Sequence, residues 1–116
     1  MQMTLHSCDI WVSTVPVDFR KSIDGLCAVI TDFGNKHPQA GLYVFYNQSR
    51  DKVKILGWHH NGFVLVYKRL EKGRFYVTKD TDGMVLLDKE QLSWLLAGLD
   101  WVSMRAWDEL SFSDFS

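Results

Sequence analysis

The sequence predicts an α+β fold, a single domain in which a mainly antiparallel β meander packs against two helices. Short runs rich in β-branched and aromatic residues recur between turn-forming residues, as they do in antiparallel sheets. Two other segments repeat apolar residues every three or four positions, which is typical of amphipathic helices. With 116 residues, 47% of them hydrophobic, the chain has the usual size of one domain. We assign residues 1–101 to this domain and residues 102–116 to an acidic C-terminal tail.

A strand and a helix are expected in the first third of the chain. Residues 10–13, IWVS, form a strand-like run that ends before Pro16. Asp18 can cap the helix that follows, and Gly34 can end it. The apolar stripe of this helix consists of Ile23, Leu26, Val29, Ile30 and Phe33.

The remaining strands should continue as a meander before a second helix. They are expected at residues 42–47, 52–58, 63–69, 74–77 and 84–87. Asn61-Gly62 is a strong hairpin signal, because both central residues of a type I′ turn need positive φ. Asp88 can start the second helix through a capping box with Gln91, and Gly98 can end it. The apolar face of this helix is Leu92, Leu95, Leu96 and Leu99.

Period-two alternation divides the side chains of the expected hairpin between two faces. The face expected to meet the core holds Val53, Ile55, Gly57, His59, Val64, Val66, Lys68 and Leu70. The other face holds Lys52, Lys54, Leu56, Trp58, His60, Phe63, Leu65, Tyr67, Arg69 and Glu71. A longer loop, HHNG, would shift the register by two residues without changing these memberships. The aromatic side chains of the second face could stack on bases, but we favour their burial under a helix, with the basic residues at a solvated rim.

Positive charge is concentrated in the middle of a chain whose formal net charge is -1. Residues 50–79 hold eight basic and two acidic residues, a balance of +6, and the remainder carries -7. Charges can cluster by chance, but this separation indicates a binding face for phosphates. Alternation points Lys68 inward, so it is the weakest member of the set. The phosphate contacts expected from the residues alone are Lys52, Lys54, Lys68, Arg69, Lys72 and Arg74.

No catalytic or metal-binding motif is apparent in the sequence. His59 and His60 are adjacent on an expected strand, so they should point to opposite faces, and no zinc-ligand spacing surrounds them. A nucleophile elbow, a P-loop and a dinucleotide-binding fingerprint are absent. Carboxylates that converge only in space, as in a two-metal nuclease, remain an open alternative. We expect a protein without enzymatic activity, cofactor or metal.

The sequence also favours a cytoplasmic location. Cys8 and Cys27 form no CxxC pair and are expected to be reduced and buried. The N-terminal residues do not have the pattern of a secretion signal, and no apolar stretch approaches the ~18 residues of a membrane span. No membrane partner is therefore expected.

Four stretches carry a resemblance to a known family. They are VDFRKSIDGL at 17–26, YVFYNQSRDKVKIL at 43–56, YKRLEKGRF at 67–75 and QLSWLLAGLDW at 91–101. In these motifs and in their order from residue 10 to residue 101, the chain resembles the TnpB accessory proteins, which are encoded by the second open reading frame of bacterial insertion sequences of the sixty-six family. One departure is that His59 and His60 follow Trp58, where the family usually has an acidic residue.

This resemblance implies a role in transposition beside a separate transposase and another small accessory protein. The residues that match the family motifs are Arg20, Lys21, Asp24, Gly25, Arg50, Asp51, Lys54, Lys68, Arg69, Leu70, Glu71, Gly73, Arg74 and Phe75. With the matched cations added, the expected nucleic-acid contacts are Arg20, Lys21, Arg50, Lys52, Lys54, Lys68, Arg69, Lys72 and Arg74. The expected function is non-catalytic binding of transposon DNA through a basic β-hairpin. The alternative is docking on the transposase without direct DNA contact, and both a monomer and a homo-oligomer are compatible with the sequence.

Overall fold

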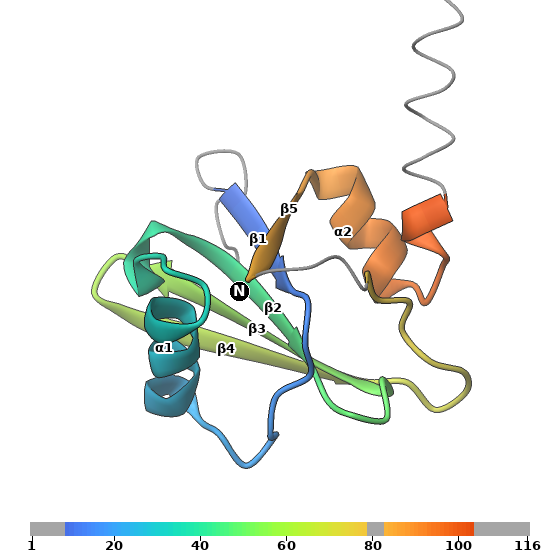
Figure 1. The fold of residues 1–116 in the computed structure, drawn as a ribbon, viewed down its shortest axis with the longest axis horizontal. Helices are drawn as coiled ribbons and strands as arrows, with labels where there is room; N and C mark the ends of the chain where they lie inside the picture. Colours follow the sequence, from blue (N-terminus) through green and yellow to red (C-terminus); the bar gives the residue numbers. More distant parts are fainter. Residues whose placement is uncertain (1–8, 79–82, 104–116) are drawn as a thin grey trace, which may run out of the picture.

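The structure, a computed structural model, describes residues 9–78 and 83–103. Figure 1 shows a twisted sheet with helices beside it. The elements are β1 (Asp9–Ser13), α1 (Ile23–Asp32), the short 3-10 helix η2 (Pro38–Ala40), β2 (Gly41–Tyr46), β3 (Lys52–His59), β4 (Gly62–Arg69), β5 (Met84–Leu87) and α2 (Lys89–Leu96). The strand order is β4-β3-β2-β1-β5, and each neighbouring pair is antiparallel except β1 with β2. The predicted α+β class is confirmed.

Two apolar cores lie on opposite faces of the sheet, because alternate residues of a strand point to opposite sides. On one face, Leu26 and Ile30 of α1 are buried with Tyr43, Phe45 and Leu56. On the other face, Leu92 and Leu95 of α2 are buried with strand residues that include Ile10, Val12, Val44, Val53 and Ile55. Every residue of β2 is therefore buried, which explains its uninterrupted apolar sequence.

The meander is shorter than the sequence predicted, because residues 74–77 form no strand. After β4 the chain turns at Gly73, which has φ 77, and bonds to the turn between β2 and β3. The Leu70 N–H donates to the Asp51 carbonyl (2.7 Å), and the Phe75 N–H donates to the Arg50 carbonyl (2.6 Å). An alternating pattern reports which side chains are buried, but it does not report which segment satisfies the backbone. Here the partner is a turn, so the strand prediction was wrong.

The position of β1 in the sheet also departs from a simple meander. It lies between β2 and β5, with Ile10 opposite Leu42 on one side and Leu87 on the other. A parallel pair needs a crossover connection, and α1 lies on the segment that joins β1 to β2. Strand β5 therefore pairs with the first strand of the chain rather than with the segment that precedes it.

Helix α1 does not use Asp18 as its cap, so that prediction was wrong. The N-cap is Ser22, whose side chain makes no capping hydrogen bond. Asp18 Oδ1 instead accepts a hydrogen bond from the backbone N–H of Arg20 at 2.9 Å. Aspartate can satisfy a local turn as readily as a helix terminus, and the sequence pattern does not distinguish the two.

Helix α2 has both ends that the sequence predicted. Asp88 Oδ1 accepts from the Gln91 N–H at 2.7 Å, and Gln91 Oε1 accepts from the Asp88 N–H at 2.9 Å, which completes a capping box. At the other end Gly98 has φ 76. The Leu99 N–H donates to the Trp94 carbonyl and the Gly98 N–H to the Leu95 carbonyl, the two bonds of a Schellman motif.

Replacing Asp88 by Ala should lower the free energy of unfolding by about 1 kcal/mol, because a polar N-cap satisfies an otherwise unpaired N–H group. Urea unfolding followed by circular dichroism measures this difference. Ser22→Ala is the matched control, since Ser22 occupies the same position in α1 without a side-chain capping bond. Equal losses in the two variants would show that the box contributes nothing measurable.

The hairpin between β3 and β4 turns earlier than predicted. His59 pairs with Gly62, so the two-residue loop is His60-Asn61, with φ 54 at His60. The prediction of a two-residue turn at Asn61-Gly62 was therefore wrong. The observed strand register is the one that the longer HHNG loop predicts. It places Trp58 opposite Phe63, with ring centroids 4.9 Å apart in an edge-to-face arrangement that stabilises the pairing. The predicted face memberships are confirmed for the paired residues.

Candidate nucleic-acid interface

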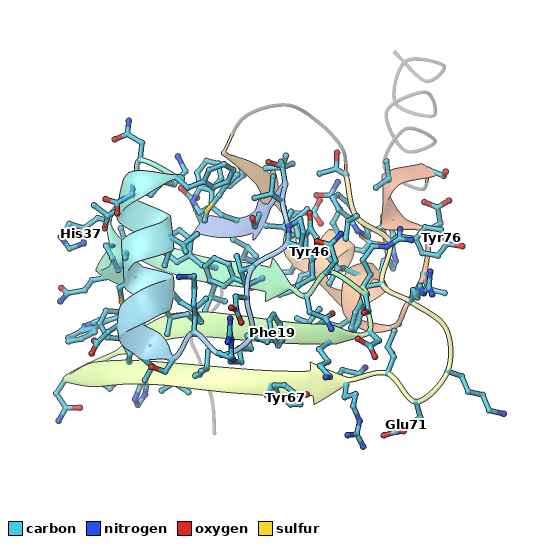
Figure 2. All side chains as sticks on the ribbon, turned by 60° about the horizontal axis from the view of Figure 1, so that its bottom comes forward. Phe19, His37, Tyr46, Tyr67, Glu71 and Tyr76 are labelled. Atoms are coloured by element: carbon cyan, nitrogen blue, oxygen red, sulfur yellow. The ribbon has the colours of Figure 1, made fainter. Side chains whose placement is uncertain are left out.

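A pair of like charges lies at the open end of the hairpin. Lys52 is directly opposite Arg69 across β3 and β4, and Lys54 is directly opposite Tyr67. All four side chains share the sheet face that α1 covers. Tyr67 is 51% exposed, and Figure 2 shows it on the outer strand of the hairpin. Like charges directly opposite each other destabilise a sheet, so stability does not account for this pair.

Two carboxylates partly compensate the pair. Arg69 Nη2 lies 2.9 Å from Glu71 Oε1, and this hydrogen bond raises the pKa of the Arg69 guanidinium. The pKa of Asp51 is lowered, first by the hydrogen bond from the Asn47 side chain and further by the charges of Lys52 and Arg69. The Asn47 amide donates to Asp51 Oδ1 at 2.7 Å, which holds Asp51 within its turn.

Lys54 connects the hairpin to a segment that is distant in sequence. Its Nζ donates to the carbonyl oxygens of Phe19 (2.8 Å) and Lys21 (2.9 Å) and lies 4.8 Å from the centroid of the Phe19 ring. The ammonium group therefore anchors residues 19–21 beside β3. This contact explains how Arg20 and Lys21, predicted from a separate motif, come to lie near the hairpin.

Arg20 and Lys21 are exposed on this anchored segment. The Arg20 side chain is 92% exposed and forms an ion pair with Asp18, with Nη2 and Oδ2 2.6 Å apart. Hydrogen bonds from Arg20 lower the pKa of Asp18 to about 2. Within the described ranges, the side chains of Lys21 and Lys52 make no ion pair or hydrogen bond. These two ammonium groups are available to an external anion.

Lys68 lies on the opposite face of the sheet, as alternation predicted. Its Nζ donates to the carbonyl oxygen of Leu96 at 2.6 Å, at the C-terminal end of α2. A cation at that position compensates the partial negative charge of the helix terminus. The structure thus gives Lys68 a role within the fold.

Three other predicted cations surround a cleft that adjoins the open end of the hairpin. Arg50 comes from the turn between β2 and β3, and Lys72 and Arg74 come from the loop after β4. The cleft has a volume of about 560 Å³. It is completed by Leu70, Gly73, Phe75, Tyr76, Ala97 and Gly98.

The nine predicted contacts therefore divide into three groups. We call Arg20, Lys21, Lys52, Lys54 and Arg69, with Tyr67, the hairpin face. We call Arg50, Lys72 and Arg74, with the residues that line their cavity, the basic cleft, and Lys68 stands apart. In residues 9–78 and 83–103 the ion pairs are Arg20 with Asp18 and Arg69 with Glu71, each between residues two positions apart.

The prediction that Trp58, Leu65 and Tyr67 lie under a helix was right for Leu65 and wrong for the two aromatic residues. Leu65 packs against the core beneath α1, as expected. Trp58 and Tyr67 stay exposed. Trp58 lies on β3 next to the hairpin turn, and Tyr67 lies on the edge strand β4 near the open end of the hairpin. Tyr76, which the sequence placed in a strand, is an exposed ring at the cleft. The nearby Gly73 and basic residues are the signal that could have identified it.

The histidines and cysteine have local environments of their own. The His59 and His60 rings lie 4.4 Å apart, so the prediction that they point apart was wrong, because His60 has left the strand. No three His, Cys, Asp or Glu side chains of the described ranges group as metal ligands. Cys27 is a half-buried free thiol whose pKa is raised by burial, and Cys8 lies outside the described residues. In the described part of the chain, no helix has the length and hydropathy to cross a bilayer.

Comparison with known proteins gives matches along most of the chain. A sequence profile of the family described as IS66 Orf2 like protein matches residues 8–106. The chain is 35% identical over 97 residues to "Uncharacterized protein y4jC" of Sinorhizobium fredii (strain NBRC 101917 / NGR234), an alignment that covers 83% of each chain. It is 31% identical over 93 residues to "Uncharacterized protein y4hO" of the same organism, covering 79% of this chain and 81% of the relative. No solved structure matches the chain.

Proposed function

Because this chain belongs to the family of IS66 Orf2 like proteins, we propose that it serves transposition as a non-catalytic accessory that binds the DNA of an insertion sequence. The resemblance found in the sequence motifs is confirmed by this membership, which relates the chain to the transposition of an insertion sequence. Within transposition, the chain would act by contacting DNA through the hairpin face. A transposase and a second accessory protein are the protein partners that this role would involve.

The arrangement of Lys52, Arg69 and Tyr67 is the observation that carries the proposal. Two cations lie directly opposite each other, and an exposed ring lies on the same face one pleat away. The cations neutralise phosphates and release counterions, which is the main source of affinity for DNA. The ring can pack on sugar or base. These are groups that bind rather than react, so we assign recognition and not catalysis to this face.

The anchored segment extends the same face. Lys54 binds two backbone carbonyls, so we assign it the role of positioning Lys21 beside Lys52. Within the described residues, neither lysine side chain forms an ion pair or a hydrogen bond, although the charge of Lys21 acts on Asp18 and that of Lys52 on Asp51. A phosphate backbone that runs across β3 and β4 could therefore contact Lys21, Lys52 and Arg69 in succession.

A charge-neutralising double variant tests this interface. Lys52→Gln with Arg69→Gln should weaken binding to a terminal-repeat duplex by about ten- to a hundredfold at 0.1 M salt and reduce the slope of log affinity against log salt by about two. Fluorescence anisotropy over a salt series measures both quantities. The matched control is Lys36→Gln with Lys89→Gln, which removes the same charge away from the face and should leave the slope unchanged.

Three results would contradict the proposal in different ways. Affinity that does not depend on salt, or that falls equally in the control, would remove the hairpin face as the DNA site. Capture of purified transposase without DNA, lost in the Lys52 and Arg69 variant, would favour docking on that protein. Cleavage of the labelled DNA with Mg²⁺, abolished by replacing one carboxylate, would replace the non-catalytic role by nuclease activity.

A further inference from the structure

Three segments that are far apart in sequence converge at the basic cleft. They are the turn that holds Arg50, the loop from Leu70 to Tyr76, and the end of α2 at Gly98. The hydrogen bond from the Phe75 N–H to the Arg50 carbonyl joins the first two segments. A volume of about 560 Å³ lies in the range of ~300–1,000 Å³ that holds small ligands. One nucleotide unit is of this size class.

The charge of the cleft favours an anion. Arg50, Lys72 and Arg74 contribute three positive charges, and no acidic residue is among the described residues that line the cavity. Arg50 has φ 59, a conformation that glycine or asparagine adopts at lower cost than arginine. An arginine there is not explained by the turn, so its side chain is the feature that a ligand would use.

The end of α2 would oppose an anion if its carbonyls were free, because a helix C-terminus carries partial negative charge. The last four carbonyls, those of Ser93, Trp94, Leu95 and Leu96, all accept hydrogen bonds. The last of these comes from Lys68 Nζ at 2.6 Å. The partial negative charge is therefore compensated beside the cleft, which gives Lys68 an indirect role in anion binding.

Tyr76 supplies a ring on a rigid support. Tyr76 is 47% exposed, while the preceding residue, Phe75, is buried in the core. The Trp101 Nε1–H donates to the Tyr76 carbonyl at 2.7 Å, which fixes the backbone at this position. Figure 2 shows Tyr76 away from Tyr67, at the other end of the structure from α1. Such a ring offers a surface on which a base can stack.

We propose that the basic cleft binds an unpaired nucleotide of single-stranded DNA, with phosphate on Arg50, Lys72 and Arg74 and the base on Tyr76. A base in a duplex is stacked and paired, so it cannot reach a ring in a cleft, whereas an unpaired base can. The inference rests on the proposed function, because it names the DNA structure that a second site on the same protein accepts. The hairpin face would hold duplex DNA, and the cleft would hold a strand that has left the duplex.

Titration with a short oligothymidylate tests the cleft directly. The amide signals of Gly73 and Gly98, which line the cleft, should shift in NMR spectra, while that of Gly57 in β3 should not. Tyr76→Ala should weaken oligothymidylate binding by about tenfold or more, and Tyr76→Phe should retain it. Tyr67→Ala is the matched control, because it removes an equally exposed ring from the hairpin face. Lys72→Gln with Arg74→Gln should also weaken binding and lower its salt dependence.

The outcomes separate this inference from the proposed function. If oligothymidylate shifts the amide signals of Gly73 and Gly98 but the terminal-repeat duplex does not bind, the cleft inference is supported and the proposed binding of duplex DNA is contradicted. If the duplex binds but these signals do not move, or if Tyr67→Ala has the larger effect, the cleft inference is overturned. Equal affinity for hexaglutamate, with the same shifts, would also overturn it and assign the cleft to an acidic peptide.

Discussion

Trp101→Ala is expected to lower the free energy of unfolding by about 3–5 kcal/mol, the usual loss when a large buried aromatic side chain is removed. Trp101 is 0% exposed and packs in the core under α2 with Phe75 and Leu95. The substitution also leaves the Tyr76 carbonyl without its 2.7 Å hydrogen bond. A loss of this size is a large part of the stability of a domain. Urea unfolding followed by circular dichroism measures it.

Two further variants make the Trp101 result specific. Val102→Ala alters the next residue, which is exposed, and should change stability by no more than ~0.5 kcal/mol. Trp101→Phe keeps a ring in the core and removes the Nε1–H donor, so its loss should fall between the other two. If Trp101→Ala were no worse than Val102→Ala, the docking of this C-terminal segment on the core would be wrong.

Phe75→Ala should cost about 3–5 kcal/mol as well, although the segment that carries Phe75 is a loop. The side chain is 1% exposed and lies in the core under α2, and the Phe75 N–H bonds to the Arg50 carbonyl. Loss of the ring should therefore destabilise the whole domain rather than loosen one loop. Chemical unfolding should show a lower midpoint with an unchanged slope.

Tyr76→Ala is the control for Phe75→Ala, since it removes the neighbouring ring from an exposed position. Its loss should be ~0.5 kcal/mol or less, which also makes it suitable for the binding measurements. Similar losses in the two variants would mean that the loop does not contribute a buried residue. A strand at residues 74–77 would also place Phe75 and Tyr76 on opposite sides, so this pair of variants tests the burial of Phe75 and not the type of element that carries it.

Features that depend on neighbouring residues were predicted well. The capping box of Asp88 and Gln91 and the stop at Gly98 involve residues within a few positions of one another. The assignment of hairpin side chains to two faces follows from strand periodicity. It was correct although the position of the turn was predicted wrongly. The cap at Asp18 failed for the same local reason, because a turn and a helix terminus compete for one carboxylate.

The candidate site was predictable as a set of cations but not as a geometry. The sequence identified Arg50, Lys52, Arg69 and Arg74 from charge and motif. It could not divide them between the hairpin face and the basic cleft, because that division depends on the path of the chain after β4. The sequence also could not identify Tyr76 as a ring beside the cleft, since the pattern of residues 74–77 is equally typical of a strand.

From the sequence alone came the α+β class, the periodicity of each strand and helix, the charge segregation and the resemblance to the family. Tertiary structure decided the pairing of β1 with β5, the burial of Phe75, and the contacts of Lys54 with residues 19–21 and of Lys68 with Leu96. The physical reason is the distance along the chain between the residues that interact. Periodicity and capping depend on residues a few positions apart, whereas these contacts join residues that only the packing of the whole sheet brings together.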